Sequence, residues 1–257
     1  MWELYRVDED FSQANNLAAK YPDKLKELQA AFDIEEKNYN VYPHDSSFAS
    51  RADPAIGASL TRARYEFTYY SGMARIPEGS APNFKNQSWA IAAEVNIPEN
   101  GASGVLATIG GRFGGWAFLM QDSKPEFVYA LSNQPDHKFR NASGQHVPPG
   151  NHVVRFSFKY DGGGIGKGAT GTLFVDGTPV AEGQIPRTVG VRFSLDETFD
   201  VGSDMGTPVV EDYADKMPFA FTGTLKKFVV VLEPENLTPE ERKRLLEEEA
   251  RALMSVH

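Results

Sequence analysis

The densest group of ionisable side chains in this chain lies between two apolar segments, close to two glycines at positions 202 and 206. Its carboxylates are Asp196, Glu197, Asp200 and Asp204. Like charges at this spacing repel one another unless a cation or hydrogen-bond donors neutralise them. Carboxylate oxygens suit Ca²⁺ and glycines let a chain wrap around an ion, so a calcium or other divalent metal site is one interpretation. The other is a tight corner whose carboxylates accept backbone N–H bonds or pair with Arg187 or Arg192.

Two histidines supply a second set of candidate metal ligands. His137 and His146 flank a polar stretch that begins at Asp136 and is expected to be a loop. With Asp136 they could bind a transition metal or activate a water molecule. Two histidines in an exposed loop are, however, more often ordinary surface side chains. The candidate metal ligands of the chain are therefore Asp196, Asp200, Asp204, His137 and His146.

Tryptophan offers a route to a different function, because sugar-binding sandwiches stack pyranose rings on aromatic side chains. Trp89 and Trp116 are the candidates for a carbohydrate-binding surface. Strand alternation places Trp116 and Phe118 on the same face, so at least one of them is expected in the core.

Composition narrows the classes of partner. The 257 residues include 26 Lys and Arg against 35 Asp and Glu, a formal net charge of −9 that disfavours a nucleic-acid partner. The absence of cysteine removes disulfides, zinc thiolates and a cysteine nucleophile. No apolar stretch approaches the roughly 18 residues of a membrane span, and the first residues lack the character of a signal peptide. We therefore expect no membrane association and a cytoplasmic location.

The elements that must position these residues are mostly strands. In His152–Tyr160 the apolar side chains alternate with polar ones, as in a half-buried strand. Similar short runs, separated by Gly, Pro and Asn, recur between residues 51 and 233, and Asp176-Gly177 is typical of a two-residue hairpin turn. Many strands without intervening helices favour a mainly β antiparallel sandwich or jelly roll.

Helices are expected on both sides of the sandwich. Residues 1–50 contain a helix that begins near Pro22, with an apolar stripe that needs a partner surface. Residues 234–257 begin with a capping box at Thr238–Glu241 and form a charged amphipathic helix. That helix should pack on the sandwich or on another subunit.

Three stretches together resemble the C-terminal region of bacterial arylsulfatases. They are the start Trp2-Glu-Leu-Tyr-Arg with the following Asn16-Leu-Ala, the turn Gly171-Thr-Leu-Phe-Val-Asp-Gly177, and the acidic run that begins at Arg192. The resemblance implies that residues 1–50 are a remnant of the catalytic domain's C-terminus, 51–233 a concanavalin- or laminin-G-like sandwich, and 234–257 an added helix.

The same resemblance implies that the chain turns over no sulfate esters. It has no cysteine to become the formylglycine nucleophile, and it lacks the paired aspartates and the His/Lys set of the family's catalytic sheet. Ser47-Phe-Ala-Ser-Arg51 has only the outline of a serine-type nucleophile motif. We therefore predict an accessory module that acts in binding or in assembly of a homo-oligomer. The alternatives are a metal-dependent hydrolase of phosphate, sulfate or carboxylate esters and a carbohydrate-binding module, with a small ester or a glycan as the ligand.

Overall fold

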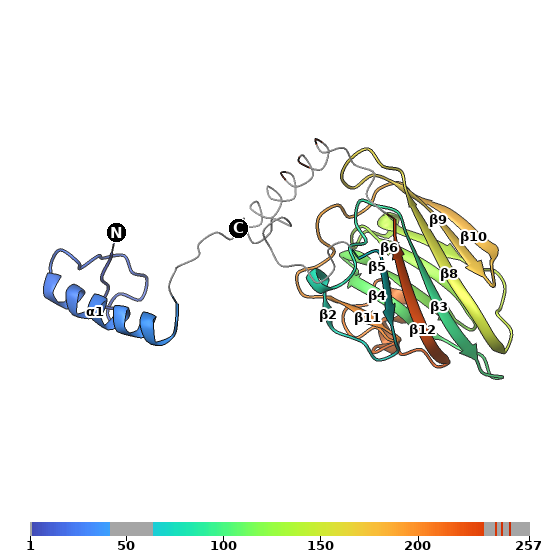
Figure 1. The fold of residues 1–257 in the computed structure, drawn as a ribbon, viewed down its shortest axis with the longest axis horizontal. Coiled ribbons are helices and arrows are strands. Elements are labelled where there is room, and N and C mark those ends of the chain that lie inside the picture. The colour runs from blue at the N-terminus through green and yellow to red at the C-terminus, as the bar shows by residue number, and fades with distance from the viewer. Residues whose placement is uncertain (1, 42–63, 234–239, 241–242, 244–246, 248–257) are drawn as a thin grey trace. The chain divides into compact units, whose positions relative to one another are not determined.

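The computed structural model describes residues 2–41, 64–233, 240, 243 and 247. The chain divides into two units, Met1–Arg51 and Ala52–His257 (Figure 1). The Ser47–Arg51 motif and most of the helix predicted over 234–257 lie outside the described residues. Within the part of the chain that is described, no helix has the length and apolarity needed to cross a membrane.

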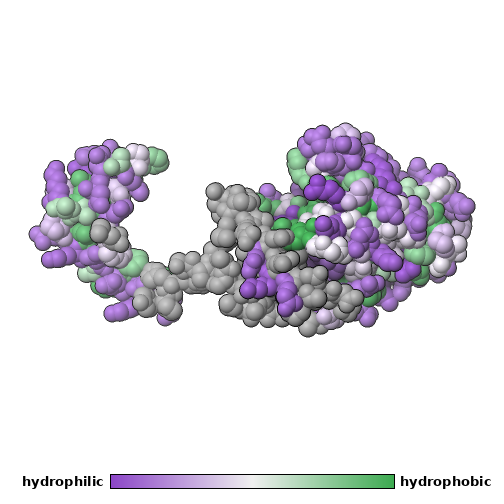
Figure 2. Space-filling model, turned by 90° about the horizontal axis from the view of Figure 1, so that it is seen from above, coloured by the Kyte–Doolittle hydropathy of each residue, from purple (hydrophilic) through white to green (hydrophobic). Residues whose placement is uncertain are grey.

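The described part of the first unit contains one helix, α1 (Pro22–Asn38), which starts at the predicted proline. None of the helix's side chains is buried. Trp2 packs edge to face on Phe32, with 5.4 Å between the ring centroids, and so covers part of the predicted apolar stripe. Leu28 and Tyr39 stay exposed, and Figure 2 shows apolar side chains among polar ones at the surface of this unit.

The second unit is built from two six-stranded antiparallel sheets, which confirms the predicted mainly β sandwich (Figure 1). Sheet A has the order β1 (Glu66–Tyr69), β12 (Thr224–Leu232), β3 (Trp89–Ile97), β8 (Gly150–Tyr160), β9 (Ala169–Val175) and β10 (Thr178–Ile185). Sheet B has the order β2 (Ile76–Pro77), β11 (Thr198–Val201), β4 (Gly104–Gly111), β5 (Gly114–Gln121), β6 (Lys124–Ala130) and β7 (Lys138–Ala142). Three short 3₁₀ turns complete it: η1 (Glu78–Ser80), η2 (Pro135–His137) and η3 (Glu211–Lys216).

Local signals in the sequence account for several of these elements. Asp176 and Gly177 have φ angles of +49° and +82° and join β9 to β10, as predicted. The expected loop over residues 136–146 is wrong in part, because β7 runs through it and pairs with β6. The strand was missed because its side chains are mostly polar. As the last strand of sheet B, β7 is held by backbone hydrogen bonds to one neighbour only.

Aromatic side chains fill the space between the sheets. The Trp89 ring stacks on Phe158 at 4.6 Å and lies 5.6 Å from Trp116, while Phe127 stacks on Phe156 at 3.7 Å. These rings come from both sheets and form one continuous core. Burial of this much aromatic surface is the main source of the sandwich's stability.

The outer faces of the two sheets differ. On β3 of sheet A, buried and half-buried residues alternate along the strand. On β4 of sheet B every residue is buried, and on β5 all but the last. The outer face of sheet B is covered by residues 205–219, here called the cover segment, whose apolar side chains pack on Val105, Leu119 and Val128.

Candidate functional site

The acidic corner is built from hydrogen bonds within the protein. Asp200 and Asp204 are only 2% and 1% exposed. Asp200 accepts backbone N–H bonds from Arg75 at 2.5 Å and from Met205 at 3.0 Å. Asp204 accepts the Tyr213 hydroxyl at 2.9 Å. These contacts match the tight-corner interpretation, in which carboxylates satisfy backbone and side-chain donors.

The other two acids of the run differ in their surroundings. Glu197 accepts the backbone N–H of Thr207 at 3.1 Å, whereas Asp196 is exposed. Of the two arginines named as possible partners of the run, Arg187 and Arg192, the Arg192 side chain lies 4.0 Å from Glu78 instead. Glu78 also accepts the backbone N–H of Phe193, so it anchors the start of the acidic run to η1.

Burial raises the pKa of Asp204 to about 6 from an ordinary value of 3.8, and the nearby charges of Asp200 and Glu197 act in the same direction. The Tyr213 hydroxyl and the Gly206 N–H oppose this rise by stabilising the carboxylate. The corner therefore holds a carboxyl group that takes up a proton close to neutral pH.

The candidate metal ligands do not form one site. His137 precedes β7 and contacts Ser132, with 2.7 Å between Nδ1 and Oγ, whereas His146 follows β7. The intervening strand has five residues of about 3.3 Å each, so it separates the two imidazoles. Asp196 is exposed, whereas Asp200 and Asp204 are buried in the corner. Among the described residues, no three His, Cys, Asp or Glu side chains are grouped as metal ligands.

The two tryptophans predicted to stack on sugars belong to the core. Trp89 is 1% exposed and Trp116 is fully buried. The Trp89 Nε1–H donates to the backbone oxygen of Phe84 at 3.0 Å. Both indoles point between the sheets, where no sugar can reach them. The prediction that they form a carbohydrate surface is therefore wrong.

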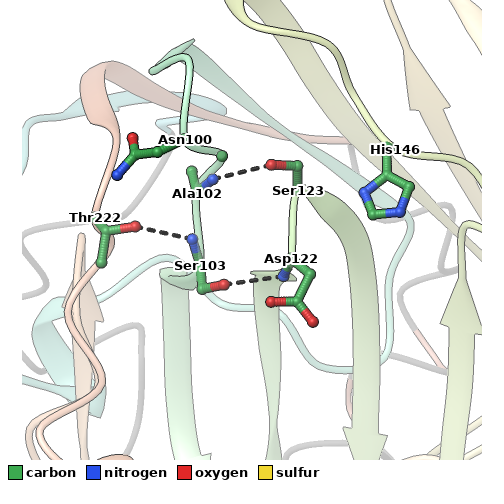
Figure 3. A pocket seen from close by; sticks show the side chains of 8 residues that line it. Asn100, Ala102, Ser103, Asp122, Ser123, His146 and Thr222 are labelled. Atoms are coloured by element: carbon green, nitrogen blue, oxygen red, sulfur yellow. Dashed lines mark hydrogen bonds between the residues drawn. The ribbon is translucent and has the colours of Figure 1, made fainter.

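A polar pocket of about 460 Å³ lies at one end of the sandwich, where the loops that follow β3 and β7, the β5–β6 turn and the loop before β12 meet (Figure 3). It is lined by Asn100, Gly101, Ala102, Ser103, Asp122, Ser123, His146 and Thr222. Only His146 was a candidate from the sequence.

The floor of the pocket is a rigid two-residue turn. Asp122 and Ser123 have φ angles of +48° and +59°, the left-handed conformation that a tight hairpin requires at both central positions. The Ser123 backbone N–H donates to the Ala102 carbonyl oxygen at 2.7 Å. The Ser123 carbonyl oxygen accepts the Val147 N–H at 2.8 Å. These bonds tie the turn to two of the loops that surround it.

Three hydroxyl groups face this turn and its neighbours. The Ser123 Oγ accepts the Ala102 N–H, the Thr222 Oγ1 accepts the Ser103 N–H, and the Ser103 Oγ accepts the Asp122 N–H, each at 2.9 Å (Figure 3). Within the described structure these three hydroxyl protons have no acceptor. In each of these hydroxyl groups the oxygen accepts a hydrogen bond that fixes its position. The O–H group can therefore donate a hydrogen bond to a ligand.

The remaining polar groups of the pocket are also available. The Asn100 amide, the Asp122 carboxylate and the His146 ring have no hydrogen-bond partner among the described residues. In Figure 3 the His146 ring lies beyond Ser123 and is bonded neither to a hydroxyl nor to Asp122. In the described part of the chain no hydrogen bond joins a hydroxyl of the pocket to the His146 ring, as a nucleophile–base pair would require, whereas the free donors and acceptors can bind a ligand.

Comparisons with known proteins add similarities of fold. No family model and no curated protein matches the sequence. The sialidase CBM40 of Ruminococcus gnavus, solved with α2,3-sialyllactose, is 13% identical, with a TM-score of 0.41 over 72% of this chain and 96% of that one. Domain 4 of an extracellular GH43 arabinanase from Geobacillus stearothermophilus, solved with arabinotriose, is 15% identical, with a TM-score of 0.38 over 63% of this chain and 67% of that one.

The LG4-5 domains of the mouse laminin α1 chain are also similar, at 12% identity and a TM-score of 0.37 over 66% of this chain and 39% of that one. The resemblance carried by the stretch Gly171–Gly177 implied a laminin-G-like sandwich.

Proposed function

We propose that the sandwich is a carbohydrate-binding module that holds a saccharide in the pocket beside the Asp122–Ser123 turn. The observation that carries the proposal is the set of six polar side chains that line this pocket with unused hydrogen-bonding capacity. A saccharide presents many hydroxyl groups, each of which donates and accepts. It can therefore satisfy hydroxyl donors and carboxylate acceptors at the same time.

The size and rigidity of the pocket support this function. Its volume of about 460 Å³ lies within the range of roughly 300–1,000 Å³ that is common for small-ligand sites. The turn and the loops are joined by backbone hydrogen bonds, so little ordering is needed when a ligand binds. This proposal takes up the carbohydrate-binding alternative of the sequence analysis with a different set of residues. Descent from an arylsulfatase, a role in oligomer assembly and a bound metal stay predictions.

Isothermal titration calorimetry with a panel of neutral and acidic oligosaccharides tests the function. Tryptophan fluorescence is a poor probe, because Trp89 and Trp116 are buried in the core. We expect at least one saccharide to bind, and Asn100→Ala to weaken its binding about tenfold, the loss of roughly one hydrogen bond. The matched control is Asn133→Ala, since Asn133 is exposed and follows β6, in the connection that leads to His137.

Two results would overturn the proposal. The first is a wild-type protein that binds no saccharide of the panel at millimolar concentrations. The second is a bound saccharide whose affinity is the same in the wild type and in the Asn100→Ala variant, which would place the binding surface elsewhere on the molecule.

A further inference from the structure

We infer that the pocket selects uncharged saccharides, with Asp122 accepting hydrogen bonds from two neighbouring hydroxyl groups of the ligand. This inference rests on the proposed function. Asp122 is the only carboxylate among the eight residues that line the pocket. Its backbone N–H donates to the Ser103 Oγ, so a ligand meets acceptor groups at this residue, and the carboxylate is the charged one among them.

The hydrogen-bonding groups of the pocket complement a diol. An ionised carboxylate only accepts hydrogen bonds. Each of its two oxygens can accept a hydrogen bond from one of two adjacent hydroxyl groups. The hydroxyl protons of Ser103 and Thr222 need acceptors, which the oxygens of the same sugar supply. A sugar with two free neighbouring hydroxyls therefore satisfies both kinds of group.

The charge of the pocket disfavours acidic saccharides. Neither lysine nor arginine lines it, and His146 is the only lining side chain that can become cationic. A carboxylate, sulfate or phosphate on the ligand would be brought next to Asp122, and like charges at an interface lower the affinity. The formal net charge of −9 on the chain acts in the same direction.

The turn keeps the selecting carboxylate in a defined place. Asp122 has a φ angle of +48°, which Asp and Asn tolerate better than most residues because their short polar side chains hydrogen-bond locally. Asp122→Asn therefore preserves the turn and the size of the side chain, while it removes the charge and one of the two acceptor oxygens.

Calorimetry with matched pairs of sugars tests the inference. The probes are methyl glucoside and methyl galactoside, the corresponding glucuronide and galacturonide, and the 6-sulfates of glucose and galactose. We expect the wild type to bind a neutral member at least tenfold more tightly than its acidic counterparts. Asp122→Asn should weaken the neutral sugar about tenfold, which corresponds to 1.4 kcal/mol, and should narrow the difference between neutral and acidic sugars. Asp136→Asn, a change to an exposed acid in η2, should leave both affinities unchanged.

The outcomes separate the inference from the function on which it rests. If no saccharide of either kind binds, the proposed function fails. If saccharides bind but acidic members bind as tightly as neutral ones, the function stands and the inference fails. The inference also fails if Asp122→Asn matches the wild type for every probe. An unchanged unfolding midpoint for Asp122→Asn shows that a loss of binding comes from the site, and Ser103→Ala, which should also weaken the neutral sugar, provides an independent check.

Discussion

The outer faces of the two antiparallel sheets differ in whether a segment of the described chain covers them. On sheet A, β3 reads as alternating buried and half-buried residues, so among the described residues its outer face is left open. Sheet B carries the cover segment on its outer face, and β4 reads as an unbroken buried run. An antiparallel strand that is apolar on both faces therefore signals a covering segment elsewhere in the chain.

The cover segment is attached differently at its start and in its middle. At its start, Asp200 and Glu197 accept the backbone N–H groups of residues 205 and 207. Further along, Arg112 pairs with Glu211 at 2.8 Å, and Arg140 pairs with Asp212 at 2.7 Å. The acidic run thus serves as the anchor of a covering element. These hydrogen bonds account for the position of Asp200 and Glu197 at this corner.

A charge placed on each outer face gives the largest expected contrast. Val128 is fully buried under the cover segment, so Val128→Lys should lower the free energy of unfolding by more than about 4 kcal/mol. Ala92→Lys places the same side chain on the open face, where its ammonium group can reach water, and should cost less than about 1 kcal/mol. Urea unfolding followed by tryptophan fluorescence measures both. Similar losses for the two variants would mean that the outer face of sheet B is not covered in solution.

Removal of one hydroxyl tests the attachment of the cover segment. The Tyr213 hydroxyl donates to Asp204 and accepts the Val209 N–H, both at 2.9 Å. Tyr213→Phe leaves these two buried groups without a partner and should lower the free energy of unfolding by about 1–3 kcal/mol. Tyr70→Phe changes an exposed tyrosine beyond the end of β1 and should stay within about 0.5 kcal/mol of the wild type. A Tyr213→Phe variant as stable as the wild type would contradict the anchoring role.

The pH dependence of stability sharpens the comparison further. Because the pKa of Asp204 is raised to about 6 in the folded protein and is 3.8 in its ordinary state, the folded state binds more protons between these values. The contribution of Asp204 to stability is therefore fully present below about pH 4 and is lost as the pH rises through 6. Asp204→Asn removes this dependence but retains an acceptor for Tyr213. We expect the stability of the wild type relative to Asp204→Asn to fall by about 1–3 kcal/mol between pH 4 and 7, as measured by urea unfolding. A constant difference across this range would be inconsistent with a raised pKa.

Ion pairs on the two faces give the smallest expected contrast. Arg140 joins β7 to the partly buried Glu126 and to Asp212 in the cover segment, so Arg140→Gln should cost about 1 kcal/mol. Glu94 pairs with Lys227 on the open face at 2.8 Å, and Glu94→Gln should produce no measurable change, because solvent screens this pair. Thermal unfolding at low and high salt separates the two. A larger loss for Glu94→Gln would reverse the ranking of the two faces.

The sequence alone predicted the sandwich fold but did not predict which residues form the pocket. Alternation in β3 and β8 and the Asp-Gly turn are local signals, because they report a strand's own two faces and its own bend. The cover segment and β7 have no such signal, since their polar residues are stabilised by contacts distant in sequence. The pocket brings together four loops that are far apart along the chain, so its residues cannot be grouped by spacing. The two tryptophans were misassigned because a strand pattern shows which residues share a face but does not show which face points inward.

Helix α1 buries none of its side chains, and this has a consequence for handling the protein. A helix of 17 residues without a buried face is marginally stable. It therefore unfolds readily, and its peptide bonds become accessible to a protease. Brief trypsin digestion should therefore cleave after Lys24, Lys26 or Lys37 before any strand of the sandwich is cut. The product that survives would keep every residue of the polar pocket and would be a compact starting point for crystallisation with a sugar.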